Sequence, residues 1–168
     1  MLIEADKRGK DFAVPLMYRR EGEPPFFVPE NVHLLGLMNI ADRSLSIVDY
    51  ALRRRFAFVN LRPEFESPVF REWLAERDME HDLIELIVER MSQLNRTIAE
   101  DPLLGENYCI GHSFYCPRGD DFSSLSRKWF DAIATTEIIP LLHEYWFDAP
   151  SKAKDAAAAL TAPWSRNR

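Results

Sequence analysis

The sequence contains few cysteines and no long hydrophobic run. Its 168 residues include two cysteines, Cys109 and Cys116, which are too few for a disulfide-stabilised scaffold. No apolar stretch approaches the ~18 residues that a membrane-spanning helix needs, and the N-terminus carries no signal-peptide pattern. We therefore expect a reduced, cytoplasmic protein without a membrane segment.

The sequence also lacks the residues with which nucleotide hydrolases hold phosphate and magnesium. It has no G-x-x-x-x-G-K-[ST] phosphate loop, and none of its apolar stretches ends in a pair of acids. The formal net charge is −6, which argues against a surface that wraps nucleic acid. Any anion would bind at a local basic patch such as Arg53, Arg54 and Arg55.

Hydrophobic residues make up 46% of the sequence and charged residues 29%, as in a soluble globular protein with one core or two small ones. The first 12 residues predict the end of an amphipathic helix that stops at Gly9, which suggests that other residues belong before them. Residues 12–32 then predict a β-hairpin with Gly22 in its turn.

Residues 32–61 predict a strand, a helix and a second strand. The stretches 32–38 and 56–61 are apolar on both faces, as buried strands are. Between them, the apolar spacing predicts a helix over residues 45–54, with Asp42 or Ser44 as its N-cap. Residues 62–68 have the composition of a connector, and a domain boundary is expected there.

The second half of the chain is expected to be helical. An apolar stripe runs from Leu83 to Ile98, a second helical region covers residues 124–147 with an interruption at Pro140, and an alanine-rich helix follows before a frayed tail. The predicted fold class is therefore α/β followed by all-α, with domains at residues 1–66 and 67–168.

Two groups of polar residues are candidates for a site. Asn39 follows the predicted strand at 32–38, and ligands of open α/β sheets bind at the carboxyl ends of strands. Asn39 and Asp42 could equally cap the turn that follows. The three arginines at positions 53–55 could complement a helix dipole, or one of them could reach a nucleotide held by a neighbouring subunit.

A third candidate is a metal site at Cys109, His112 and Cys116, because thiolate and imidazole are zinc ligands. The three residues leave a tetrahedral site one ligand short. Buried thiols and a hydrogen-bonded histidine are the preferred interpretation.

Several motifs resemble one family over nearly the whole chain. "MNIADRS" followed by "DYALRRRF" is the most specific pair, and "GHSFY" and "PLLHEYWFD" support it independently. Together they resemble AAA+ nucleotidases of the McrB type, the GTP-hydrolysing motors of methylation-dependent restriction systems. The resemblance implies the C-terminal part of an AAA+ core, with an incomplete sheet and a hairpin, followed by a helical lid domain.

The resemblance also implies roles for single residues. Asn39 matches sensor 1, which positions the attacking water, and Asp42 and Arg43 match the signature turn beside it. Arg54 and Arg55 match the arginine-finger region that faces the nucleotide of the next subunit.

Two further matches are weaker. Arg53 is a lesser candidate for the arginine finger, and His112 is the candidate for a nucleotide-sensing residue of the lid. The hairpin at residues 12–28 resembles the one that precedes sensor 1 in one branch of the superfamily.

By the same resemblance, the complete subunit would use GTP or ATP with Mg²⁺, form a ring expected to be a hexamer, and work with a nuclease partner that cuts DNA. The phosphate loop and the Mg²⁺-holding acids should lie upstream of Met1, so this chain alone is expected neither to bind nucleotide tightly nor to hydrolyse it. Two alternatives stay open: a non-enzymatic module for assembly or partner docking, and a DNA-binding module, against which the net charge counts.

Overall fold

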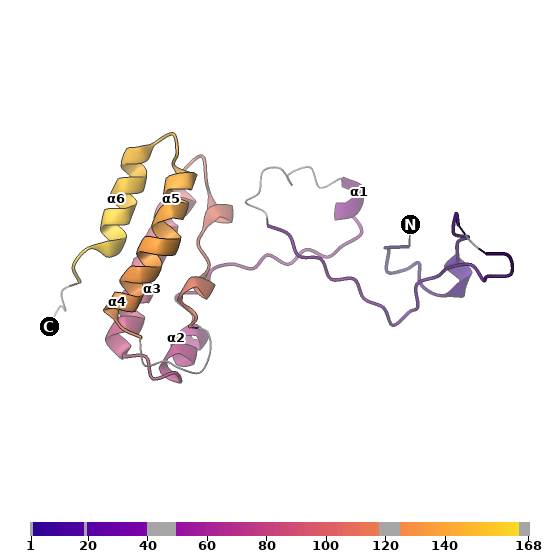
Figure 1. Cartoon of the computed structure of the whole chain (residues 1–168), viewed down its shortest axis with the longest axis horizontal. Coiled ribbons are helices and arrows are strands. Elements are labelled where there is room, and N and C mark those ends of the chain that lie inside the picture. The colour runs from indigo at the N-terminus through magenta and orange to yellow at the C-terminus, as the bar shows by residue number, and fades with distance from the viewer. Residues whose placement is uncertain (1, 19, 40–49, 118–124, 165–168) are drawn as a thin grey trace. The chain divides into compact units, whose positions relative to one another are not determined.

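The computed structural model describes residues 2–18, 20–39, 50–117 and 125–164 of the chain (Figure 1). The chain divides into two units, Met1–Asn60 and Leu61–Arg168. None of the helices within the described ranges is long and apolar enough to cross a membrane.

In the described part of the first unit, the predicted hairpin is reduced to one antiparallel bridge. Val14 and Phe26 exchange backbone hydrogen bonds with N–O distances of 2.8 and 2.9 Å. Gly22 lies in the connecting turn with a φ of 85°, a left-handed conformation that favours glycine. The amide of Gly9 donates to the carbonyl of Val28 at 2.9 Å, which ties the chain before the hairpin to the residues after it.

The two predicted strands around the arginine run are not formed. Residues 32–38 and 56–61 are described throughout, and neither pairs with another strand in the part of the chain that the structure describes. Their apolar side chains stay in solvent: Leu35 and Leu37 are 91% and 90% exposed, and Val59 is 81% exposed. A strand is stable only when its backbone groups are paired and its apolar faces covered, and the described residues supply neither condition. The α/β part of the predicted fold class is therefore not observed.

Among the described residues of the first unit, helical structure is short. Residues 2–7 form turns instead of the predicted helix end, and a single 3-10 turn, η1 (Lys10–Phe12), follows. So short a segment cannot repay the entropy of helix nucleation without tertiary packing. Helix α1 (Tyr50–Arg53) falls within the helix predicted over 45–54. Residues 42–49, with both N-cap candidates, lie outside the described residues.

The second unit is helical, as the sequence predicts. Its α-helices are α2 (Pro68–Ala75), α3 (His81–Glu100), α4 (Arg127–Ile133), α5 (Ile139–Tyr145) and α6 (Pro150–Thr161). Helix α6 packs against both α3 and α5 (Figure 1). The aromatic segment between α3 and α4 contains two 3-10 turns, η3 (Glu106–Tyr108) and η4 (His112–Tyr115).

Helix α3 supplies the centre of the core. Its apolar residues recur at helical spacing and bury one face of the helix. The buried residues of α3 are Leu83, Ile84, Leu86, Ile87, Val88, Met91, Leu94 and Ile98. Three aromatic side chains, Tyr115, Phe130 and Trp146, are also buried in this core. Each large apolar side chain contributes roughly 1.5–3 kcal/mol by its removal from water.

The helical region before α6 is interrupted at the predicted place. A π-helical segment, Ala134–Ile138, joins α4 to α5, and Pro140 is in the first turn of α5. Proline has no N–H and its ring crowds the carbonyl one turn earlier, so a wider turn just before it relieves the clash.

Candidate functional site

The three arginines at the end of α1 and directly after it, Arg53 to Arg55, differ in their surroundings. Arg53 is exposed, and its Cζ lies 5.9 Å from the ring centroid of Phe58. Arg54 is exposed as well, and within the described residues its side chain makes neither an ion pair nor a hydrogen bond. The side chain of Arg55 is only 23% exposed.

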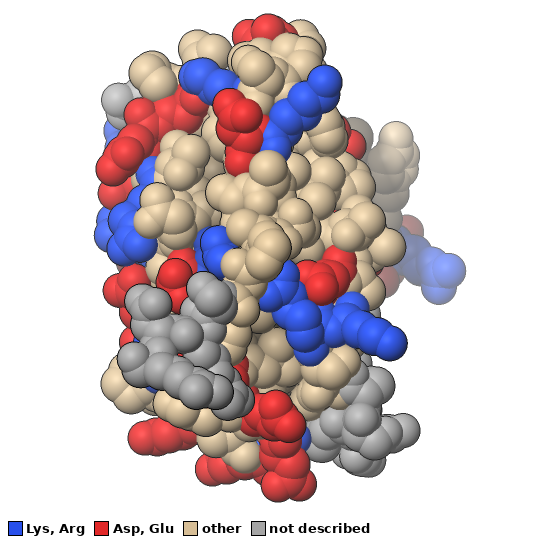
Figure 2. All heavy atoms as spheres, turned by 90° about the vertical axis from the view of Figure 1, so that its left-hand side faces the viewer, with Lys and Arg blue, Asp and Glu red and all other residues tan. Residues whose placement is uncertain are grey.

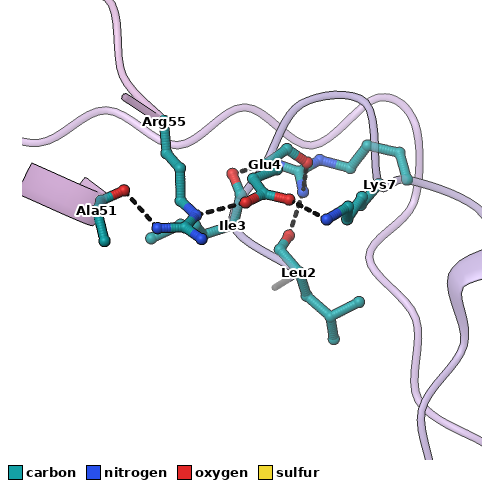
Figure 3. A network of polar contacts seen from close by, with 7 residues as sticks. Leu2, Ile3, Glu4, Lys7, Ala51 and Arg55 are labelled. Carbon is teal, nitrogen blue, oxygen red and sulfur yellow. Dashed lines mark hydrogen bonds and ion pairs between the residues drawn. The ribbon is translucent and has the colours of Figure 1, made fainter. Parts of the chain in front are cut away.

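Arg55 belongs to a polar network with the N-terminal segment (Figure 3). Its Nε donates to Oε1 of Glu4 at 2.5 Å, and its Nη1 donates to the carbonyl of Ala51. The second carboxylate oxygen of Glu4 pairs with Lys7. The hydrogen bond from Lys7, followed by that from Arg55, lowers the pKa of Glu4 to about 2. Both cations thus stabilise the ionised carboxylate.

The residues matched to sensor 1 and the signature turn are described only in part. Asn39 is exposed and directly follows residues 32–38, which form no strand. Asp42 and Arg43 lie outside the described residues. The roles expected for these three residues stay predictions.

His112 lies in the second unit, beside the segment that leads into α2. Its Nδ1 accepts a hydrogen bond from the backbone amide of Glu64 at 3.1 Å, which leaves Nε2 to carry the N–H of the ring. The rings of Phe65 and Phe70 contact it, with centroid distances of 6.2 and 5.5 Å. His112 therefore anchors the start of α2, and its expected contact with nucleotide stays a prediction.

The two thiols near His112 act as hydrogen-bond donors. Sγ of Cys109 donates to the carbonyl of Asn95 and Sγ of Cys116 to that of His112, each at 3.5 Å. Burial raises the pKa of both thiols, which favours the protonated form. The described residues contain no group of three or more His, Cys, Asp or Glu placed to hold a metal ion. The contacts agree with the interpretation of partly buried thiols and a hydrogen-bonded histidine.

A cleft of about 350 Å³ opens beside α3, and its charged lining is mixed. Arg62 pairs with Glu106 at 3.3 Å and Arg96 with Glu66 at 3.9 Å, and all four side chains are more than half exposed. Such exposed pairs contribute little to stability. Because both signs of charge are present, the lining does not select for an anion.

Two polar side chains, the partly buried Asn95 and the buried Asp101, organise the second unit. The side-chain amide of Asn95 makes two hydrogen bonds to the backbone of Ile110. Its Oδ1 accepts from the Ile110 amide at 2.7 Å, and its Nδ2 donates to the Ile110 carbonyl at 2.9 Å. Asp101, which is 7% exposed, accepts from the amide of Leu103, from Nε1 of Trp146 and from Nζ of Lys152. The pKa of Asp101 is lowered to about 2, chiefly by Lys152.

Residues 86–154 match the family model described as "McrB, alpha-helical lid domain". Over 153 residues the chain is 46% identical to the "Type IV methyl-directed restriction enzyme EcoKMcrB subunit" of Escherichia coli (strain K12), a match that covers 90% of this chain and 33% of that protein. The chain is of the McrB type. It spans about a third of the length of this relative.

The match to the McrB-type lid model covers the hydrogen-bonded polar residues of the second unit. Its matched range begins within α3 and ends within α6, so Asn95, Asp101 and His112 all belong to it. Asn39, Arg54 and Arg55 precede that range, and only the match to the Escherichia coli subunit bears on the part of the chain that contains them.

The charged surface of the McrB-type lid is also mixed. On the face drawn in Figure 2, lysines and arginines lie among carboxylates and uncharged surface. A duplex-binding surface needs clustered positive charge, so this face gives no support to the DNA-binding alternative.

Sequence reasoning did not find Glu4 or Asp101. Glu4 lies 51 residues from Arg55, and Asp101 lies 45 residues from Trp146. No local pattern indicates either contact. The only signal at Asp101 is its place between an amphipathic stripe and Pro102, which predicts a helix end but not a buried carboxylate.

Proposed function

We propose that this chain is part of a ring-forming AAA+ nucleoside triphosphatase that uses GTP or ATP with Mg²⁺ to drive a DNA-cutting partner. The observation that carries the proposal is the 46% identity over 153 residues to a protein named as a subunit of a methyl-directed restriction enzyme. In this proposal residues 1–66 belong to the AAA+ core and residues 67–168 form the lid.

The proposed roles follow the family resemblance. Asn39 would position the attacking water, and Asp42 and Arg43 would form the turn beside it. Arg54 and Arg55 would contact the nucleotide of the neighbouring subunit, and the exposure of Arg54, which directly follows α1, supports such a role. A guanidinium at a transferring phosphoryl group accelerates the reaction by about 10³ to 10⁵.

His112 is proposed to sense nucleotide through the lid. Its support is indirect: Nδ1 is engaged by the amide of Glu64, and Nε2 is the ring nitrogen left for another contact. A change at Nε2 would be transmitted to the start of α2, because His112 contacts Phe70 there.

The test is a mixing experiment with the complete subunit, in which these residues are joined to an upstream phosphate loop. GTPase and ATPase activities are measured for Arg54→Ala and for Arg55→Ala, each alone and each mixed with a variant inactivated at the phosphate loop. Arg20→Ala, at another exposed arginine of the first unit, is the matched control.

If the arginines act across subunits, each variant is impaired alone and activity returns in the mixture, because wild-type arginines then face intact phosphate loops. Full activity of both arginine variants alone would contradict the proposed role. The ratio of the GTPase to the ATPase rate identifies the base.

A non-enzymatic docking module is the second candidate, and exposed apolar side chains of the lid favour it. Phe147 is 79% exposed and Leu103 is 60% exposed, so each offers an apolar contact that a partner could cover. A complete subunit that assembles with its partner but turns over neither nucleotide would support this candidate over the first.

A further inference from the structure

Arg55 is held by its own chain. Its Nε–H is bound to Glu4 and its Nη1 to the carbonyl of Ala51 (Figure 3). The facing carboxylate is 18% exposed and the guanidinium side chain 23%, so the pair is partly removed from water. Charge-assisted bonds of this kind are roughly twice as strong as neutral ones.

The segment that carries Glu4 is also held in place. Lys7 pairs with the second oxygen of the Glu4 carboxylate. Arg8 donates to the carbonyls of Leu2, Ile3 and Glu4. The Glu4 carboxylate therefore contacts Arg55 from a turn that hydrogen bonds hold in place. This limits the positions that the Arg55 guanidinium can adopt.

The neighbouring Arg54 is in the opposite situation. It is exposed, and among the described residues it has no bonded partner. A phosphate could bind Arg54 without any bond being broken, whereas Arg55 would first have to leave Glu4 and Ala51.

We propose that Glu4 is a positioning residue: it holds the side chain of Arg55 in place in the turn after α1, so that Arg54 is the arginine that reaches the neighbouring subunit. This inference rests on the proposed function, since it divides between two arginines a role that was given to both.

The first experiment needs no nucleotide. In the 168-residue chain, hydrogen exchange of the arginine Nε–H groups is followed by NMR in the wild type, in Glu4→Gln and in the control Glu21→Gln, at an exposed glutamate of the same unit. The Nε–H of Arg55 should exchange several-fold faster in Glu4→Gln than in the wild type. In Glu21→Gln it should exchange at the wild-type rate. Equal exchange rates of the Arg55 Nε–H in all three proteins would show that Glu4 does not hold Arg55 in place.

The second experiment measures kcat and KM in the complete subunit. Arg54→Ala should lower kcat most. Glu4→Ala and Arg55→Ala should each lower it less, and their combination should cost no more than either alone, because both remove one contact. The exchanged pair Glu4→Arg with Arg55→Glu should recover part of the loss.

Two results would overturn the division of roles. A kcat that rises in Glu4→Ala would mean that Glu4 withholds Arg55 from the nucleotide. A loss confined to Arg55→Ala, with Arg54→Ala fully active, would make Arg55 the acting residue. If both arginine variants are fully active, the proposed function fails together with the role of Arg54, while the exchange experiment still decides whether Glu4 holds Arg55.

Discussion

The indole Nε1 of Trp146 donates a hydrogen bond to Oδ2 of Asp101 at 2.9 Å, and both residues are buried. The same oxygen accepts from Nζ of Lys152 at 2.8 Å. Asp101 is the C-cap of α3, Trp146 is the C-cap of α5, and Lys152 lies in the first turn of α6. One carboxylate therefore joins three helices at one end of the lid.

Asp101→Ala should lower the free energy of unfolding by about 2–4 kcal/mol. The change removes the acceptor of three donors and leaves the buried indole N–H of Trp146 unpaired, and unpaired buried groups cost about 1–3 kcal/mol each. Asp101→Asn keeps an acceptor oxygen and should cost about half as much. Urea unfolding of the chain measures both.

The matched control is Asp148→Asn, at an exposed aspartate just after Trp146, which should change stability by less than about 0.5 kcal/mol. Equal stability of Asp101→Ala and the wild type would show that the three contacts do not stabilise the lid.

The ion pair of Asp101 predicts a pH dependence. The pKa of Asp101 falls from its ordinary 3.8 to about 2 on folding, so the unfolded state binds its proton more readily. The stabilisation is complete above pH 4 and is lost as the pH falls from 4 through 2. We expect the wild type to lose about 1–2 kcal/mol more than Asp101→Asn over this range, a value reduced because Lys152 is half exposed.

Urea unfolding of the wild type and of Asp101→Asn at pH 4, 3 and 2 isolates the contribution of Asp101 to the pH dependence of stability. Glu4, whose pKa is also lowered, is present in both and cancels. Parallel losses in the two proteins would contradict the assignment.

Tyr115→Phe should stabilise the lid by about 1 kcal/mol. The hydroxyl of Tyr115 is buried and has no hydrogen-bond partner among the described residues, and burial raises the pKa of this group. Removal of an unpaired buried hydroxyl recovers its desolvation cost. The ring stacks on Phe130, with centroids 5.1 Å apart, and this contact survives the change.

The control for that change is Tyr18→Phe, at a tyrosine that is 94% exposed, which should leave the urea midpoint unmoved. A lower midpoint for Tyr115→Phe, at unchanged m-value, would mean that the hydroxyl has a partner whose loss matters.

Asn95→Asp should destabilise the lid by about 1–3 kcal/mol. The new carboxylate can still accept from the amide of Ile110, but its second oxygen would face the carbonyl to which Nδ2 of Asn95 now donates. The thiol of Cys109, which donates to the carbonyl of Asn95, should also react faster with a thiol reagent.

Asn107→Asp makes the same chemical change at an exposed position and should affect neither readout. An Asn95→Asp protein as stable as this control would refute the role given to the Asn95 and Ile110 contact.

Local patterns in the sequence predicted α3, the helical region of α4 and α5, and α6, but not α2. The apolar stripe of α3 and the interruption at Pro140 were found because both depend on residues within one or two turns of each other. The motif pairs that resemble the McrB type were likewise continuous in sequence, and the comparisons confirm the type.

The strands at 32–38 and 56–61 could not be judged in this way, because an apolar stretch becomes a strand only when another strand pairs with it. The described residues provide no such pairing. The apolar pattern favours burial, but burial depends on neighbours that a local pattern does not specify, and Leu35, Leu37 and Val59 are exposed.

The sequence by itself therefore determined the helical lid, its buried stripe and its family type, since each is encoded in neighbouring residues. Only the tertiary structure decided that Asp101 joins α3 to Trp146 and that Glu4 holds Arg55 while Arg54 stays exposed. Contacts across 45 and 51 residues arise from the path of the folded chain, and that path is set by packing as a whole rather than by any short stretch of sequence.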